Sequence, residues 1–390
     1  VGKNIIRLKL LSFAVSTSLA SVAGSLLAHY ITFVSPQSFT VEETIFILAM
    51  VVLGGTGNFV GSVAGALCLV ILPELLKFID LPQATADLTR NVLYGLILIL
   101  ILRLRPAGLF PERYRLSIPP DLLRAKGSFD LEPFKNARNG EVTLEGKELS
   151  KMFGGITAAR SVSIELRSGM VTGLIGPNGA GKTTAFNLLT GFLAPTSGSI
   201  VLRNKPIVGM PPHQIVRAGV ARTFQDLRLF KKMPVIENVL VAFPNQAGDS
   251  LWNVFFARRR VAAEERRNIA RALNILDFVG LRSKAEQDAA HLSYAEEKLL
   301  VIARLLATEA EVLLLDEPLA GLAPNTLEEV LPIIRKLAER GRTVCLIEHN
   351  LEVISAACDT VSFIDAGEVV ASGRPAELMQ NSHLLERYIR

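Results

Sequence analysis

Three stretches of the chain lack charged side chains, and all three lie in its first 105 residues. Residues 10–41, 44–73 and 91–102 contain no Asp, Glu, Lys or Arg. The first stretch is long enough to cross a bilayer as a helix, which takes about 20 apolar residues. Small residues recur every four positions within it, a spacing that lets the helices of a membrane protein pack closely. These residues are Ser16, Ala20, Gly24 and Ala28. A buried helix of a soluble core is the alternative.

The second uncharged stretch is interrupted by glycine. Residues 54–62 read Gly-Gly-Thr-Gly-Asn-Phe-Val-Gly-Ser. So much glycine breaks a helix, and in lipid a broken helix is tolerated only where protein or water surrounds the freed backbone. Discontinuous segments of this kind often lie near transport pathways. A loop between two short helices explains the pattern equally well.

Basic residues flank the uncharged region on both sides. Lys3, Arg7 and Lys9 precede the first stretch, and Arg103 and Arg105 follow the third. Basic flanks favour the cytoplasmic side of a membrane, so the number of crossings should be even. Three stretches conflict with this parity unless the glycine-broken one crosses twice or re-enters, and we predict that it does.

The character of the chain changes after the third stretch. Residues 106–140 combine mixed charge with little periodicity, which is typical of a linker. Its prolines are Pro106, Pro111, Pro119, Pro120 and Pro133. From Val142 onward, strand-like and helix-like runs alternate, which predicts a mixed α/β domain.

One run of the α/β part is unusually rich in arginine. Residues 252–281 are predicted to form a single helix with six arginines, at positions 258–260, 266, 267 and 271. A solvated helix face, with Glu264 and Glu265 as partners for the arginines, is the favoured interpretation. A polybasic surface is the alternative.

A glycine-rich motif joins a predicted strand to a predicted helix. Residues 176–184 have the form G-x-x-x-x-G-K-T, after an apolar strand-like run at 170–175 and before a helix-like run at 184–189. This order lets backbone N–H groups and a helix N-terminus surround a phosphate. Lys182 would reach the β- and γ-phosphates, and Thr183 would supply a hydroxyl to Mg²⁺. A glycine-rich turn before a helix is the alternative. The predicted nucleotide-binding residues of this loop are Gly176, Pro177, Asn178, Gly179, Ala180, Gly181, Lys182, Thr183 and Thr184.

A second motif places two carboxylates after a buried-strand pattern. Residues 312–315 are apolar, and Asp316 and Glu317 follow them. Asp316 would help to hold Mg²⁺, directly or through water, and Glu317 would polarise an attacking water. Alone, such a pair is as often a helix N-cap. Together with the phosphate-binding loop, the pair indicates nucleotide hydrolysis.

Composition narrows the class of protein. The 390 residues are enough for two or three domains, and 49% of them are hydrophobic, which is high for a soluble protein. The formal net charge of +5 requires no nucleic-acid partner. The three cysteines are far apart without a C-x-x-C pair, which suggests neither a metal site nor a disulfide framework. The chain opens on Val1 with no secretory signal pattern, and we expect it to start inside a longer protein.

These motifs, with a helix-rich insertion between them, resemble those of ATP-binding cassette (ABC) ATPases, and the resemblance covers Val142 to Arg390. It implies a P-loop NTPase fold with a helical subdomain, and ATP with Mg²⁺ as ligands. It further implies that Phe153 stacks on adenine and that Gln225 senses Mg²⁺ and the membrane partner. His349 resembles the family histidine that contacts the γ-phosphate. Glu317, His349 and Gln225 are thus the candidate catalytic residues, and Thr183, Asp316 and Gln225 the candidate metal-site residues.

Two sets of stretches resemble the importers of branched-chain amino acids found in bacteria. In the ATPase part these are Phe153-Gly154-Gly155, residues 174–184, Arg222-Thr223-Phe224-Gln225 and Ile236-Glu237-Asn238-Val239. The first part resembles the C-terminal end of a permease of such importers. The stretches are Ala28-His29-Tyr30, Ser35-Pro36, residues 50–55 and Arg105-Pro106-Ala107-Gly108-Leu109.

The resemblance implies a permease–ATPase fusion in a bacterial inner membrane. The expected parts are a multi-pass permease end at 1–105, a linker at 106–141 and a cytoplasmic ABC domain at 142–390, with its helical subdomain at about 228–305. The family architecture implies membrane lipid around the chain, a second permease, a second ATPase and an external solute-binding protein. Urea or short amides are rival substrates. A lipid-export cassette is another alternative. A soluble cassette of DNA repair or translation would bind nucleic acid, and the uncharged stretches argue against it.

One motif departs from the family. Each ATP in such transporters lies between one subunit's phosphate loop and the other subunit's signature, commonly L-S-G-G-Q or L-S-Y-G-Q. The corresponding residues are Leu292, Ser293, Tyr294, Ala295 and Glu296. Ala295 adds a methyl group where glycine lets the backbone approach phosphate. Glu296 adds a charge that should repel phosphate unless it is protonated or turned away.

Ser293 and Glu296 also have the spacing of a capping box, which would turn the carboxylate back onto the start of the helix. Ala323 is a further departure, because the family usually has Asp or Asn there. We therefore predict two unequal ATP sites, the weaker one being that which uses this chain's signature.

Overall fold

A computed structural model of the chain describes most of its residues. They are residues 3, 5–31, 41–76, 92, 95, 96, 99, 100, 103, 104, 108–110, 116, 118–124 and 140–381. The chain divides into two compact units, one formed by Ile5–Leu116 and the other by Val1–Asn4 with Ser117–Arg390. Each unit is described by itself.

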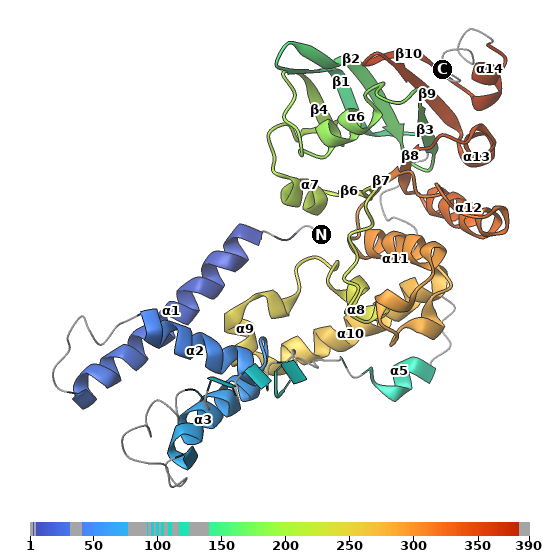
Figure 1. The fold of residues 1–390 in the computed structure, drawn as a ribbon. Coiled ribbons are helices and arrows are strands. Elements are labelled where there is room, and N and C mark those ends of the chain that lie inside the picture. Colours follow the sequence, from blue (N-terminus) through green and yellow to red (C-terminus); the bar gives the residue numbers. More distant parts are fainter. Residues whose placement is uncertain are drawn as a thin grey trace. The chain divides into compact units, whose positions relative to one another are not determined.

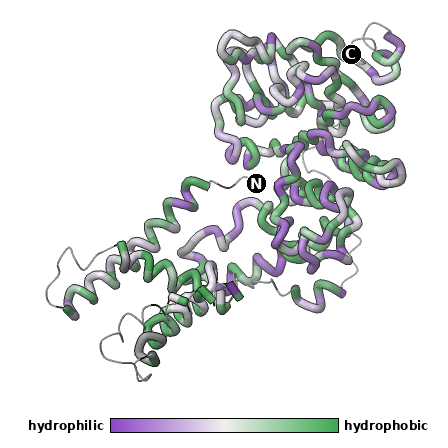
Figure 2. The backbone as a smooth tube through the Cα atoms, in the orientation of Figure 1, coloured by the Kyte–Doolittle hydropathy of each residue, from purple (hydrophilic) through white to green (hydrophobic). Residues whose placement is uncertain are grey.

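The first unit consists of apolar helices. They are α1 (Ile5–Ile31), α2 (Val41–Gly54) and α3 (Phe59–Leu76). Among the described residues, α1 is the one helix that is long and apolar enough to cross a membrane. The alternative of a buried soluble-core helix is wrong for α1, because none of its residues is buried. Hydrophobic residues run along all three helices (Figure 2). Gly24 faces open space within the described structure, so close packing along the small-residue stripe stays a prediction.

Helices α2 and α3 pack against each other through their backbones. A Cβ atom added at Gly54 would lie 2.0 Å from the carbonyl oxygen of Gly61, and one at Gly65 would lie 2.2 Å from that of Met50. The glycines therefore permit a contact that any larger residue would block. The break predicted in the second uncharged stretch is confirmed, since residues 55–58 separate the two helices. Whether the pair crosses the membrane or re-enters stays a prediction.

The second unit contains two sheets (Figure 1). The smaller is antiparallel, with the order β2-β1-β4-β5, and the larger has the order β10-β9-β3-β8-β7-β6. Strands β6, β7, β8, β3 and β9 are parallel, and β10 is antiparallel to β9. The strands are β1 (Val142–Phe153), β2 (Ile156–Arg167), β3 (Val171–Ile175), β4 (Ser197–Leu202), β5 (Lys205–Pro206), β6 (Val220–Arg222), β7 (Val312–Asp316), β8 (Thr343–Ile347), β9 (Thr360–Asp365) and β10 (Glu368–Gly373).

Helices complete this unit. The α-helices are α5 (Pro120–Arg124), α6 (Lys182–Leu189), α7 (Pro212–Ala218), α8 (Val235–Leu240), α9 (Leu251–Phe256), α10 (Arg258–Phe278), α11 (Tyr294–Ala307), α12 (Pro324–Glu339), α13 (Leu351–Ala357) and α14 (Pro375–Met379). The short 3₁₀ helices are η2 (Ala247–Asp249), η3 (Arg282–Lys284) and η4 (Ala289–His291). The predicted α/β class is confirmed.

The central strands position the site. All five residues of β3, β7 and β8 are buried, as expected for parallel strands covered on both faces. In the register, Leu174 of β3 and Asp316 of β7 both lie opposite Ile347 of β8. The carboxyl ends of the three strands are therefore level, and the loops that leave them meet at one edge of the sheet, where open α/β sheets bind ligands.

Two details differ from the sequence prediction. The predicted single helix over 252–281 is two helices, α9 and α10, with Ala257 between them at φ −125° and ψ 39°. The break follows Val254, Phe255 and Phe256, which are weak helix formers. The stretch predicted as a linker contains α5, which docks on the same unit through an ion pair of 2.5 Å between Arg266 and Asp121.

Candidate nucleotide-binding site

The loop between β3 and α6 has the conformation that its glycines predict. Gly176 and Gly181 have φ angles of 152° and 102°, and Gly179 has 79°. A Cβ atom at Gly176 would lie 2.0 Å from the carbonyl oxygen of Ile364, and one at Gly181 would lie 2.8 Å from that of Ala158. These two glycines let the loop pack against neighbouring backbone. Gly179 faces open space, on the side from which a ligand can approach.

Lys182 lies over this loop at the start of α6. Its Nζ donates to the carbonyl oxygens of Gly176, at 2.7 Å, and of Pro177, at 2.9 Å. Burial lowers the pKa of Lys182, and the charges of Glu317 and Asp316 oppose that shift. Asn178 and Thr183 are exposed. Pro177 and Thr184 are half-buried, and Ala180 is buried.

The N-terminus of α6 has no side-chain cap. Its first N–H groups are thus available to an anion, and the lysine amine lies beside them. The loop accordingly offers glycine-lined space, helix N–H groups and an ammonium group together, which suits a phosphate chain.

Two predicted catalytic residues contact the side-chain carboxylate of a third. Gln225, which follows β6, donates from Nε2 to Glu317 Oε2 at 3.3 Å. His349, which follows β8, contacts Glu317 Oε1 through Nε2 at 2.8 Å. Glu317 itself follows β7 with φ +48°, a left-handed conformation that is uncommon for a residue with a side chain. The structure therefore brings these three residues together, and their catalytic roles stay a prediction.

Asp316 is held by an arginine whose role the sequence analysis missed. Arg222 Nη2 donates to Asp316 Oδ2 at 3.0 Å, and both side chains are almost fully buried. Burial raises the pKa of Asp316, and the charge of Arg222 opposes that shift. Arg222 also donates to Asn187 Oδ1 and lies 4.6 Å from the ring centroid of Phe224. The sequence signal that could have indicated this pair is that two short strands end in residues of opposite charge. Strand β6 ends in Arg222, and its neighbour β7 ends in Asp316.

Phe153 stands apart from these contacts. It ends β1, its side chain is exposed, and the amine of Lys151 lies 5.3 Å from its ring centroid. An exposed ring is free to stack on a base. Among the described residues, no contact of Phe153 ties it to the phosphate loop.

The signature residues begin α11 and form the capping box. Glu296 N–H donates to Ser293 Oγ at 3.4 Å, and Ser293 N–H donates to Glu296 Oε2 at 3.0 Å. Glu296 Oε1 also pairs with Lys284 Nζ at 2.5 Å. Burial opposes ionisation of Glu296, but the hydrogen bonds of Lys284 and Ser293 outweigh it and lower its pKa. The carboxylate is thus turned back onto the start of the helix, and its hydrogen bonds favour the ionised form. Ala295 is half-buried.

Helix α11 also contacts the segment after Glu317. Lys298 is buried and donates from Nζ to the carbonyl oxygen of Glu317 at 2.8 Å. Tyr294 donates from its hydroxyl to the carbonyl oxygen of Ala320 at 3.4 Å. Leu292 is buried just before the helix. The signature helix is therefore tied to the loop that carries Glu317, and Lys298 is a second residue that the sequence analysis missed.

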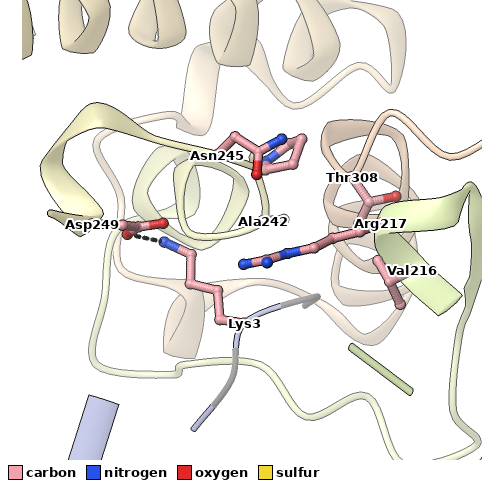
Figure 3. A pocket seen from close by; sticks show the side chains of 8 residues that line it. Lys3, Val216, Arg217, Ala242, Asn245, Asp249 and Thr308 are labelled. Carbon is pink, nitrogen blue, oxygen red and sulfur yellow. Dashed lines mark hydrogen bonds and ion pairs between the residues drawn. The ribbon is translucent and has the colours of Figure 1, made fainter. Parts of the chain in front are cut away.

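A small pocket elsewhere in the unit contains none of the predicted site residues (Figure 3). Lys3 donates to Asp249 there at 2.7 Å, and the side chain of Arg217 extends toward the same place. The charged groups of this pocket, two cations and one carboxylate, do not indicate a particular class of ligand. The loop at 176–184 therefore remains the candidate site.

A glycine loop with a lysine, at the carboxyl edge of a parallel sheet and beside a carboxylate-ended strand, defines a P-loop nucleotide hydrolase. Comparison with known proteins gives the family. Residues 159–320 match the family described as ABC transporter, and residues 1–102 match the one described as branched-chain amino acid transport system / permease component.

Similar proteins cover the ATPase part. The chain is 40% identical over 242 residues to the high-affinity branched-chain amino acid transport ATP-binding protein LivG of Salmonella typhimurium, covering 62% of this chain and 95% of that protein. It is 38% identical over 247 residues to BraF of Pseudomonas aeruginosa, which bears the same description, covering 63% and 97%.

Solved structures of ATP-binding cassettes are also similar to the ATPase part of the chain. A nucleotide-free ATP-binding cassette from an ABC transporter superposes with a TM-score of 0.57 at 32% identity, covering 64% of this chain and all of that one. A cassette in its ADP conformation gives 0.56 at 32% identity, covering 64% and 99%. The chain belongs to the ABC transporter family. It is an ATP-binding transport ATPase, and the permease match with helix α1 indicates association with a membrane, the ATPase part being cytoplasmic.

Proposed function

We propose that this chain is the fused permease–ATPase component of an importer that uses ATP to take up branched-chain amino acids. The observation that carries the proposal is the presence of both parts in one chain: a match to the permease component of such systems at residues 1–102 and an ABC cassette at 159–320. Relatives named for the same transport cover the cassette. The proposed limits are a permease end at 1–105, a linker at 106–141 and a cassette at 142–390, with a helical subdomain at about 228–305.

The described residues fit a bound Mg·ATP. The phosphate loop from Gly176 to Thr184 would hold the phosphates, with Lys182 Nζ leaving the loop carbonyls for phosphate oxygens, and Phe153 would stack on adenine. No group of three His, Cys, Asp or Glu side chains suits a metal within the described part of the chain. A magnesium ion would therefore be held by Thr183, Asp316, Gln225, phosphate oxygens and water. Bound Mg²⁺ would neutralise charge on the β- and γ-phosphates.

Glu317, with His349 and Gln225 beside it, would supply the chemistry of hydrolysis. Glu317 is placed to accept a proton from the attacking water, a contribution typically worth about 10²–10⁴-fold in rate. His349 and Gln225 contact its two oxygens, at 2.8 Å and 3.3 Å, and would orient the carboxylate toward the water.

We propose that the two ATP sites of the assembled transporter are unequal, because of the methyl group of Ala295 and not because of the charge of Glu296. Glu296 is paired with Lys284, so its charge is largely compensated, and the remaining obstacle is the methyl group of Ala295. The signature residues Leu292 to Glu296 would act on nucleotide held by a second ATPase. If Lys182→Ala in this chain and the matching change in the partner reduce turnover equally, the asymmetry is wrong.

The proposed assembly contains a second permease, a second ATPase and an external solute-binding protein. The chain would lie in the bacterial inner membrane as a multi-pass protein, with an even number of crossings in which α2 and α3 together make a pair or a re-entrant segment. Membrane lipid would surround the permease part. Substrate specificity would reside mainly in the binding protein and the permease core.

A transport experiment tests the proposal. A bacterial strain that lacks this chain is complemented with wild type or with Lys182→Ala, and uptake of radiolabelled leucine, isoleucine, valine and urea is compared. The proposal predicts that wild type alone restores uptake of the branched-chain amino acids. Restoration of urea uptake alone would support the rival importer. A lipid-export cassette would be supported if no uptake is restored and the strain that lacks the chain has lost lipid from its outer membrane.

A further inference from the structure

Helix α9 exposes an unusual amount of aromatic surface. Trp252, Phe255 and Phe256 are 70%, 67% and 70% exposed, although the helix has only six residues. The rings of Trp252 and Phe256, one turn apart, lie with their centroids 4.2 Å from each other and share one face. Exposed apolar residues are normally scattered singly, so three adjacent rings mark a contact surface.

Unpaired positive charge adjoins the aromatic rings. Residues 258–260, which begin α10, are three exposed arginines without an ion pair in the described part of the chain. Farther along α10, Arg266 pairs with Asp121 and Arg271 with Glu309, whereas Arg267 has no ion pair among the described residues. Glu264 accepts from the N–H of Ala247 at 3.1 Å. The predicted solvated face fits the exposure of these arginines, but among the described residues Glu264 and Glu265 form no ion pair with them.

We propose that the aromatic-basic patch, defined as Trp252, Phe255, Phe256 and the arginines at 258–260, docks on the headgroup region of an anionic lipid bilayer. Tryptophan and phenylalanine are well suited to the boundary between headgroups and acyl chains, and arginines beside them attract anionic lipid. Tryptophan, phenylalanine and arginine are also enriched in protein–protein interfaces, so the dependence on anionic lipid is what distinguishes the two partners. The permease match and helix α1 indicate that the chain is associated with a membrane, which makes a bilayer surface an available partner for the patch.

The patch carries its own reporter, because Trp252 is the single tryptophan of the chain. The full chain is reconstituted into lipid nanodiscs made of phosphatidylcholine alone or mixed with phosphatidylglycerol, with either ordinary or brominated acyl chains. Bromine quenches tryptophan only at short range. The proposal predicts a blue-shifted emission relative to detergent and strong quenching by brominated lipid, more so with phosphatidylglycerol present.

Charge variants separate this docking from simple proximity. Each arginine near an anionic surface contributes on the order of a fivefold change in partitioning, so the triple change of residues 258–260 to Gln should abolish most of the phosphatidylglycerol-dependent quenching. A matched control removes three exposed lysines elsewhere in the unit, as Lys147→Gln, Lys205→Gln and Lys336→Gln, and should leave the quenching unchanged.

Several results would overturn the proposal. They are an absence of quenching, quenching that the triple arginine change does not reduce, and a blue shift that arises only when a partner protein is added, which would assign the patch to a protein surface. Binding of Mg·ATP is measured on the same nanodiscs. Because the patch contains no nucleotide-site residue, failed docking with intact ATP binding contradicts this inference alone.

Discussion

Replacing Lys284 with methionine should weaken ATP-driven closure of the cassette pair while leaving the fold in place. Lys284 Nζ lies 2.5 Å from Glu296 Oε1, and the two side chains are 36% and 24% exposed. The substitution keeps the length of the side chain and removes its charge. Glu296 then carries an uncompensated negative charge at the start of the signature helix, where a partner's ATP is proposed to bind.

The size of the effect follows from the exposure of the pair. A partly exposed ion pair contributes about 0.2–1 kcal/mol to stability, so folding should hardly change. A unit charge about 8 Å from a ligand carrying about two net charges costs roughly 1 kcal/mol in a water-like dielectric. That corresponds to about a fivefold higher ATP concentration for half-maximal activity. The turnover number should change less than KM, since closure and not the chemical step is affected.

The assay is ATP hydrolysis by the complex reconstituted with its partner ATPase. Glu296→Gln is the matched control, and it should restore KM when combined with the lysine change, because no charge then remains to be compensated. The pH dependence has a defined sign. The pKa of Glu296 is lowered in the fold, so the pair stabilises the protein above the ordinary value of 4.5 and loses its effect as pH falls through the lowered pKa. The stability difference between wild type and Lys284→Met should therefore vanish in strong acid.

An unchanged KM in the lysine variant would refute this reasoning, and so would a double variant that stays impaired. The first result would mean that Glu296 does not face the partner's nucleotide. The second would mean that Lys284 acts by some means other than its charge.

Three further predictions concern groups in the ATPase part. Arg222→Met leaves Asp316 buried without its cation and should destabilise the unit by about 3–5 kcal/mol in urea unfolding followed by far-UV circular dichroism, with partial recovery when Asp316→Asn is added. Glu317→Gln should reduce ATP hydrolysis by at least about 10²-fold while ATP affinity, measured by equilibrium dialysis, is kept; retained hydrolysis would remove this residue from its proposed role. Burial raises the pKa of Cys345, and that of Cys358 to about 12, so both thiols should resist iodoacetamide in mild alkali until the protein is unfolded. Labelling is located by peptide mass, because Cys68 is half-buried, and rapid labelling of Cys345 or Cys358 in the native protein would contradict their burial.

The sequence was most informative where local chemistry dictates structure. The phosphate loop needs glycines for its backbone approach, and Gly176 and Gly181 pack where a Cβ atom would collide with carbonyl oxygens. The strand ending in Asp316 is a continuous apolar run, which is the mark of a parallel strand buried on both faces. The capping box of Ser293 and Glu296 could also be recognised, since its spacing is short and its hydrogen bonds are local.

Contacts between distant segments were beyond the reach of the sequence. Arg222 and Asp316 are paired because β6 and β7 are neighbours in the sheet, and no spacing rule records that neighbourhood. Lys284 reaches Glu296 only because a short 3₁₀ helix turns the chain back toward α11. The division of the arginine-rich run at Ala257 was also missed, because helix periodicity alone does not reveal the break that follows the weak helix formers at 254–256.

The central claim is that the loop ending in Lys182 binds the phosphates of Mg·ATP in a chain held by a membrane. Its most direct test is equilibrium binding of labelled Mg·ATP to the full chain in lipid nanodiscs, compared with Lys182→Ala and with the exposed control Lys205→Ala. We expect saturable binding by wild type and by the control, and its loss in Lys182→Ala. Absence of saturable binding by wild type at millimolar Mg·ATP, or equal binding by all three proteins, would contradict the claim.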